Sequence, residues 1–185
     1  MKWADDLLAL ADWALQLQDL RHRYLHASTA EELTITPGIA CCIETVAVLG
    51  IYESAIGKGY RRWETIDYER SYPKESEKNP RRADLAFKEP GSGKNWAYIE
   101  VKNYKGNGKV LIESDIKKLK SIEHRSQRWM LIYRIRPETG RHQALDKLLV
   151  KNFSNQIVIY GLKEFQTITE DKEDGICEIC LIKIT

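Results

Sequence analysis

The sequence lacks a hydrophobic run long enough to cross a bilayer, and it lacks the pattern of a secretory signal at its start. The longest apolar stretch, residues 35–52, is interrupted by Pro37 and Glu44, whereas a membrane-spanning helix needs about 20 consecutive apolar residues. Asp5 and Asp6 break the first apolar segment, so no signal peptide is expected. We therefore expect a soluble protein, cytoplasmic or otherwise intracellular, with no membrane partner.

Cysteine is also scarce, and the four cysteines fall in two groups, Cys41-Cys42 and Cys177-x-x-Cys180. One zinc site with four thiolates is an alternative that this grouping allows. However, adjacent residues of a helix diverge by about 100°, and residues three apart on a strand point to opposite faces. We expect buried free thiols instead.

Internal repeats and low-complexity segments are absent too. A hydrophobic content of 43% with 30% charged residues is typical of a globular chain, and 185 residues suit a single domain with one core. Within it we distinguish a helical extension over residues 1–35, a central core over residues 36–136, and a C-terminal helix with strands over residues 137–185.

The net charge of +2 conceals a strongly basic centre. From Arg81 to Arg136 there are fourteen Lys and Arg against six Asp and Glu, a local charge of +8, so the remainder carries −6. Such a centre indicates a surface that faces a polyanion, although a solvated strand and helix face would have the same composition. The basic residues that we expect to contact nucleic acid here are Arg81, Arg82, Lys105 and Lys109.

Apolar residues at helical spacing predict four helices. The first either packs on the core or pairs with a second copy of the chain in a homodimer. Thr36-Pro37 is a typical start for the second helix, and Ser114 is expected to cap the third. The predicted ranges are residues 3–26, 37–57, 115–123 and 138–152.

Alternating or continuous apolar runs predict the strands. Residues 82–88 and 96–103, joined by a Gly- and Ser-rich loop, form a hairpin. Residues 128–135 form a strand buried on both faces, and Pro137 ends it. The other predicted strands are residues 61–70, a buried strand at 156–160 and an edge strand at 175–184. The fold class is α/β, a central mixed β-sheet flanked by helices.

The hairpin brings three charged side chains together. Glu100 and Lys102 share one face because side chains alternate along a strand, and antiparallel pairing sets Asp84 opposite Glu100. Two neighbouring carboxylates are unfavourable without a positive charge between them. Mg²⁺, or Mn²⁺ in its place, prefers such oxygen ligands. We expect a metal site formed by Asp84, Glu100 and the carbonyl of Val101, with Lys102 assisting the attack of a water on a phosphate.

Asp84, followed after a hairpin loop by Glu100-Val-Lys102, resembles the PD-(D/E)xK nuclease superfamily, which has the restriction-endonuclease-like fold. The order of helix, three strands, helix and strand resembles the core of that superfamily over half to two-thirds of the chain. The resemblance implies a metal-dependent nuclease that hydrolyses phosphodiester bonds of DNA, with RNA left open. Ala83 departs from the motif because it stands where the motif has proline.

The resemblance implies further site residues on two helices. Many members of the superfamily add an upstream helical glutamate, for which Glu44 is the best match and Glu53 the next. A basic residue on the helix after the Glu-x-Lys strand contacts the phosphate backbone, which corresponds to Lys117 or Lys118.

Two other functions are compatible with the same residues. Members of the superfamily can lose activity and keep the fold, so the chain could be an inactive module that binds nucleic acid or a partner protein. The long first helix could also belong to a structural or assembly protein.

Overall fold

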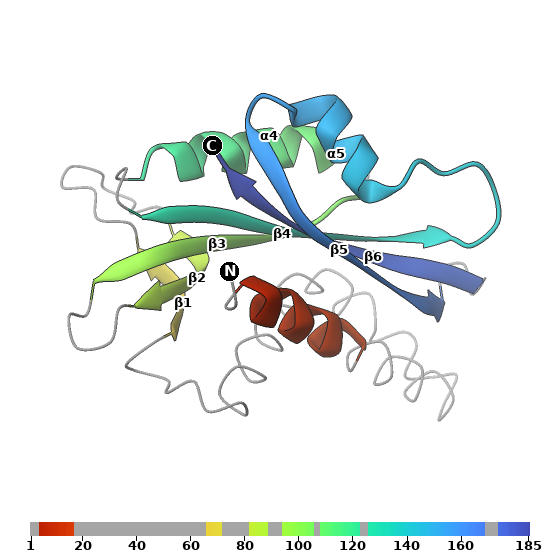
Figure 1. Ribbon diagram of the computed structural model, residues 1–185, viewed down its shortest axis with the longest axis horizontal. Helices are drawn as coiled ribbons and strands as arrows, with labels where there is room; N and C mark the ends of the chain where they lie inside the picture. Colours follow the sequence, from red (N-terminus) through yellow and green to blue (C-terminus); the bar gives the residue numbers. More distant parts are fainter. Residues whose placement is uncertain are drawn as a thin grey trace, which may run out of the picture.

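The computed structural model describes seven segments of the chain, and within them it shows a mixed β-sheet with helices on both faces (Figure 1). For residues 66–71 and Arg82 it describes the backbone alone. The predicted α/β class is confirmed at this level. The described residues are 4–16, 66–71, 82–88, 94–105, 108–122, 126–168 and 174–185.

The sheet has six strands in the order β1-β2-β3-β4-β6-β5. The first three strands form an antiparallel meander, β4 runs parallel to β3, and β6 lies antiparallel between β4 and β5. The strands are β1 Ile66–Ser71, β2 Arg82–Lys88, β3 Asn95–Asn103, β4 Gln127–Pro137, β5 Ile157–Ile168 and β6 Asp174–Ile184.

The hairpin at the centre of the sequence prediction is confirmed. β2 has the predicted bounds, and β3 begins one residue early, at Asn95. The two strands pair antiparallel with Leu85 opposite Ile99. The predicted first strand is confirmed from Ile66 onward, whereas residues 61–65 lie outside the described residues.

Helix α4, Gly108–Lys120, connects β3 to the parallel strand β4 and begins seven residues before the predicted start at Asp115. Ser114 therefore lies inside the helix and does not cap it. A Cβ at position 108 would lie 3.1 Å from the ring of Tyr104. Gly108 avoids this close contact and so permits the early start. The helix turns one apolar stripe toward the sheet, formed by Ile112, Ile116 and Leu119.

Helix α5, Leu145–Phe153, begins later than the predicted start at Glu138. Residues 138–140 form a bend, and Gly140 has a φ of 107°, in the left-handed region. A right-handed helix cannot propagate through that conformation. The helix therefore begins only after Ala144.

The places predicted for the last two strands within the sheet were wrong. β6 was expected at an edge but lies inside the sheet, where it buries side chains on both faces, and β5 is an edge strand of the described sheet, with Val158 53% exposed. Between Cys177 and Ile184, β6 carries apolar residues on both of its faces, which favours a position inside the sheet. β4 is buried on both faces from Met130 to Tyr133, as predicted.

Two hydrophobic cores lie on opposite faces of the sheet. The helix at residues 4–16 packs on one face, and α4 and α5 cover the other (Figure 1). The predicted core-packing role of the first helix is confirmed as far as residue 16; its homodimer alternative stays a prediction. Its buried residues are Ala4, Leu7, Leu8, Leu10, Ala11, Ala14 and Leu15.

The two described cysteines, Cys177 and Cys180, are buried thiols that form no disulfide bond, as predicted. They belong to different cores on opposite faces, so they cannot converge on one zinc ion. Burial, reinforced by the nearby charges of Asp146 and Glu178, raises the pKa of the Cys180 thiol to about 12. Cys41 and Cys42 lie outside the described residues.

Among the segments described, no helix is both long enough and apolar enough to span a bilayer.

Candidate active site

Asp84 and Glu100 lie side by side on the sheet face that α4 covers. The antiparallel register of β2 and β3 pairs Leu85 with Ile99, and one further step sets Asp84 opposite Glu100. The backbone N–H of Val101 donates a hydrogen bond of 2.7 Å to Oδ2 of Asp84. The convergence of the two carboxyl groups that the sequence predicted is therefore present.

Burial has the largest effect on the protonation of Asp84. The side chain of Glu100 is only 3% exposed. Burial raises the pKa of Asp84 above its usual 3.8, against the opposing effects of the Val101 N–H, the charges of Lys118 and Lys102, and a side-chain hydrogen bond with Glu100. Two carboxyl groups in hydrogen-bond contact tend to retain a proton between them unless a cation replaces it.

Lys118 supplies one positive charge to the pair from α4. Its Nζ lies 2.6 Å from Oε1 of Glu100, and its side chain is 22% exposed. The sequence placed Lys118 among the residues that contact the phosphate backbone. In the structure it contacts the acidic pair.

Lys102 lies next to the pair and has an acidic partner of its own. Its Nζ is 3.1 Å from Oδ2 of Asp115, and the two side chains are 18% and 14% exposed. Sequence reasoning missed Asp115. The spacing of Asp115 and Lys118 could have revealed it, because residues three apart share a helix face. Both residues flank the buried stripe of α4.

The five charged groups form one cluster of three carboxyl and two ammonium groups, which carries one excess negative charge when all are ionised. Carboxylate oxygens suit a hard divalent cation that retains several waters, so the residues fit Mg²⁺ or Mn²⁺ as a partial ligand set. Within the described segments, no group of three acidic, histidine or cysteine side chains forms a metal site. The Val101 carbonyl stays a predicted third ligand.

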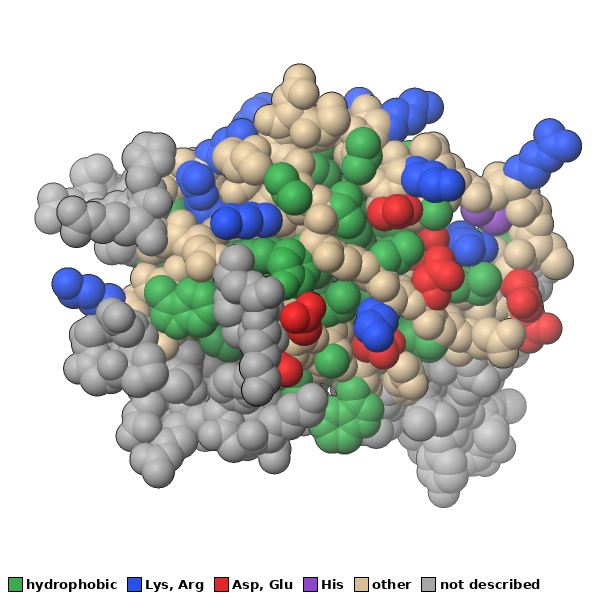
Figure 2. Space-filling model, in the orientation of Figure 1, with side chains coloured by type: hydrophobic (Ala, Val, Ile, Leu, Met, Phe, Trp, Pro, Cys, Tyr) green, Lys and Arg blue, Asp and Glu red, His purple; other side chains and the backbone are tan. Residues whose placement is uncertain are grey.

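The other residues that the sequence singled out lie in different places. Glu44 and Glu53 lie outside the described residues, as do Arg81 and the side chain of Arg82. The remaining lysines are on the surface: Lys105 and Lys109 are exposed, and Lys117 is 73% exposed beside Glu113. Figure 2 shows Lys and Arg side chains mainly along the upper part of the visible face, over α4 and α5.

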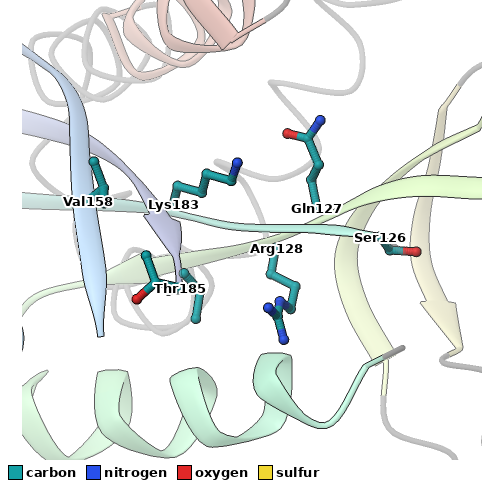
Figure 3. A pocket seen from close by; sticks show the side chains of 7 residues that line it. Ser126, Gln127, Arg128, Val158, Lys183 and Thr185 are labelled. Carbon is teal, nitrogen blue, oxygen red and sulfur yellow. The ribbon is translucent and has the colours of Figure 1, made fainter. Parts of the chain in front are cut away.

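An open depression of about 560 Å³ lies at the rim of the sheet, apart from this cluster. In Figure 3, Lys183 and Gln127 point to one side of the sheet and Arg128 and Thr185 to the other. None of the acidic residues of the cluster lines it. Its lining residues are Ser126, Gln127, Arg128, Val158, Lys183, Ile184 and Thr185.

Comparisons with known proteins assign no family to the chain. No protein-family model matches it, and neither the curated proteins nor the solved structures contain a match. The chemistry of Asp84, Glu100, Lys102, Asp115 and Lys118 is therefore the basis for a functional assignment.

Proposed function

We propose that the protein is a metal-dependent nuclease that hydrolyses phosphodiester bonds of DNA, and that it belongs to the PD-(D/E)xK superfamily. The observation that carries the proposal is the contact between the half-buried carboxyl group of Asp84 and the buried carboxyl group of Glu100 on neighbouring strands, with Lys102 beside them. The antiparallel β1-β2-β3 meander, followed by α4 and the parallel strand β4, supports the superfamily assignment.

Four of the five charged residues of the cluster have a role in this reaction. Asp84 and Glu100 hold the cation, and the Val101 N–H orients Asp84 by its hydrogen bond. A bound Mg²⁺ or Mn²⁺ makes water more acidic and offsets charge on the phosphate. The Lys102 ammonium, kept in place by Asp115, stabilises the negative charge that develops during hydrolysis.

The second candidate is an inactive module with the same fold that binds nucleic acid or a partner protein. The observation that favours it is the pairing of both lysines with internal acids, Lys118 with Glu100 and Lys102 with Asp115. A cluster in which each lysine is paired with an acid in this way can persist without a metal. This candidate predicts salt-dependent nucleic-acid binding without hydrolysis.

A cleavage assay separates the two candidates. The full chain is incubated with single-stranded, duplex and branched DNA, and with RNA, in Mg²⁺, Mn²⁺ or EDTA. The nuclease proposal predicts cleavage of DNA that EDTA abolishes. Glu100→Gln and Lys102→Met should each lower the rate by about 100-fold or more, because each removes a group that acts on the transition state.

Lys120→Met is the matched control for Lys102→Met, because it removes the same charge from an exposed position on α4. It should cleave at close to the wild-type rate. Metal-independent binding with no cleavage of any substrate would contradict the nuclease proposal and support the inactive module. Cleavage of RNA alone would retain the chemistry and change the substrate.

A further inference from the structure

The position of Lys118 raises a question about how a metal reaches Glu100. The ammonium of Lys118 lies 2.6 Å from Oε1 of Glu100, and its side chain is more exposed than that of Glu100, 22% against 3%. An ion that coordinates Oε1 would come close to this ammonium. Two cations at one partly buried oxygen repel each other strongly because screening by solvent is weak there.

We infer that Lys118 occupies the cation position on Glu100 until a divalent metal ion displaces it, and that the displaced Lys118 then binds a phosphate of the substrate. The inference rests on the proposed function and adds a regulatory step at the same site. It assigns Lys118 two successive partners, the Glu100 carboxylate before metal binding and the substrate phosphate after it.

Lys118 can make this exchange without unfolding of the helix. It lies in the last turn of α4, and a lysine has a long flexible stem that carries a compact charge. Lys102 differs because Asp115, 3.1 Å away on the same helix, holds it. Metal binding would therefore move Lys118 and leave the Lys102–Asp115 pair in place.

The exchange also couples the metal to the substrate. While Lys118 is paired with Glu100, its charge is neutralised locally and it attracts a phosphate weakly. Release makes the Lys118 ammonium available beside the metal position, where the phosphate would lie. Metal should therefore increase the affinity for nucleic acid through Lys118 as well as through its own charge.

The test compares Mn²⁺ affinities of the full chain, measured by the electron paramagnetic resonance signal of free Mn²⁺. The variants are Lys118→Met, Lys120→Met as the matched charge control at an exposed position of the same helix turn, and Glu100→Gln. We expect Lys118→Met to bind Mn²⁺ about tenfold more tightly than the wild type, equivalent to about 1.4 kcal/mol, because the ion no longer displaces an ammonium. Lys120→Met should match the wild type, and Glu100→Gln should lose the site.

The same proteins are then titrated with duplex DNA in the presence and in the absence of Ca²⁺, which serves as the divalent ion in this experiment. Ca²⁺ should increase the DNA affinity of the wild type and of Lys120→Met, and the increase should be several-fold smaller in Lys118→Met. An equal increase in all three proteins would contradict the transfer of Lys118 to the phosphate.

The outcomes separate the inference from the proposed function. The first outcome is that the wild type binds Mn²⁺ through Glu100 and that Lys118→Met binds it equally or more weakly. This outcome would overturn the exchange but would still support the metal site. An absence of Glu100-dependent Mn²⁺ binding in the wild type and in Lys118→Met would overturn the metal site itself, and the exchange with it.

A destabilised Lys118→Met variant would still report on the exchange. Its melting temperature should rise more on addition of Mn²⁺ than that of the wild type, because the tighter-binding protein gains more from the ligand. Lys118→Gln keeps a hydrogen-bond donor for Glu100, and its melting temperature should also rise more on addition of Mn²⁺ than that of the wild type. A smaller rise in both variants than in the wild type would count against the exchange.

Discussion

Two buried glutamates on the same face of the sheet have very different partners. Glu178 of β6 is fully buried, and its Oε2 lies 2.5 Å from Nε of Arg134 and 3.3 Å from Nε of Arg136. Its Oε1 accepts a hydrogen bond of 3.2 Å from the N–H of Leu145, the first residue of α5. Glu100 of β3 instead has a lysine from α4 and a second carboxyl group beside it.

The difference shows which of the two glutamates is structural. Two arginines on the neighbouring strand and a backbone N–H satisfy Glu178 and fix the start of α5 against the sheet. Glu100 keeps an unfavourable acidic neighbour and depends on a flexible lysine. An arrangement that costs stability and retains titratable groups in contact is typical of a functional site.

The largest expected effect comes from breaking the structural glutamate. Glu178→Ala leaves two guanidinium groups without their buried partner, which should lower the free energy of unfolding by about 3–5 kcal/mol. Urea denaturation followed by circular dichroism measures the change. Glu164→Ala, at an exposed position of the neighbouring strand β5, should change stability by no more than about 0.5 kcal/mol. Equal stability of both variants would refute the structural role of Glu178.

An intermediate effect is expected from loosening Lys102 within the candidate site. Asp115→Asn removes the charge that holds the Lys102 ammonium, so kcat for cleavage should fall by about 10- to 100-fold. KM should change little, because Lys102 acts mainly on the transition state. Glu113→Gln, which affects the exposed partner Lys117, is the control and should retain kcat. A rise in KM alone would assign Asp115 to substrate binding.

The smallest effect concerns the pH dependence of stability. Burial raises the pKa of Asp84 in the folded chain above 3.8, with Glu100, Lys102 and Lys118 facing it. The folded protein therefore retains this proton longer than the unfolded chain, and stability that is present below pH 3.8 is lost as pH rises through the raised pKa. Asp84→Asn does not titrate and should not lose that contribution.

Thermal melts of the wild type and Asp84→Asn at a series of pH values check this prediction. The advantage of Asp84→Asn should grow from about pH 3.8 upward and then become constant. An advantage that shrinks with rising pH would mean that Asp84 is stabilised as the carboxylate, contrary to the dominance of burial.

The hairpin of β2 and β3 was predictable from the sequence because it forms between neighbouring segments, whereas the places of β5 and β6 in the sheet were not. The alternation in β2 and β3 and the loop between them determined the hairpin and placed Asp84 opposite Glu100. The positions of β5 and β6 depend on pairing between distant segments, and both strands carry enough apolar residues for an interior place.

The candidate site was predictable only in its hairpin half. Asp115 and the inward position of Lys118 depend on the phase of α4, which the misplaced helix start concealed. A start at Gly108 would have placed both residues beside the buried stripe. The predicted helical glutamates, Glu44 and Glu53, lie outside the described residues, so their contribution stays a prediction.

The most direct measurement is a crystal structure of the protein with Mn²⁺, with anomalous diffraction used to locate the ion. The account predicts one strong anomalous peak between the carboxylates of Asp84 and Glu100, with metal–oxygen distances of roughly 2.0–2.2 Å, close to those of Mg²⁺. It also predicts that Lys118 has moved away from Glu100 while the Lys102–Asp115 pair persists. An absence of the peak at saturating Mn²⁺, with the Lys118–Glu100 pair intact, would contradict the account.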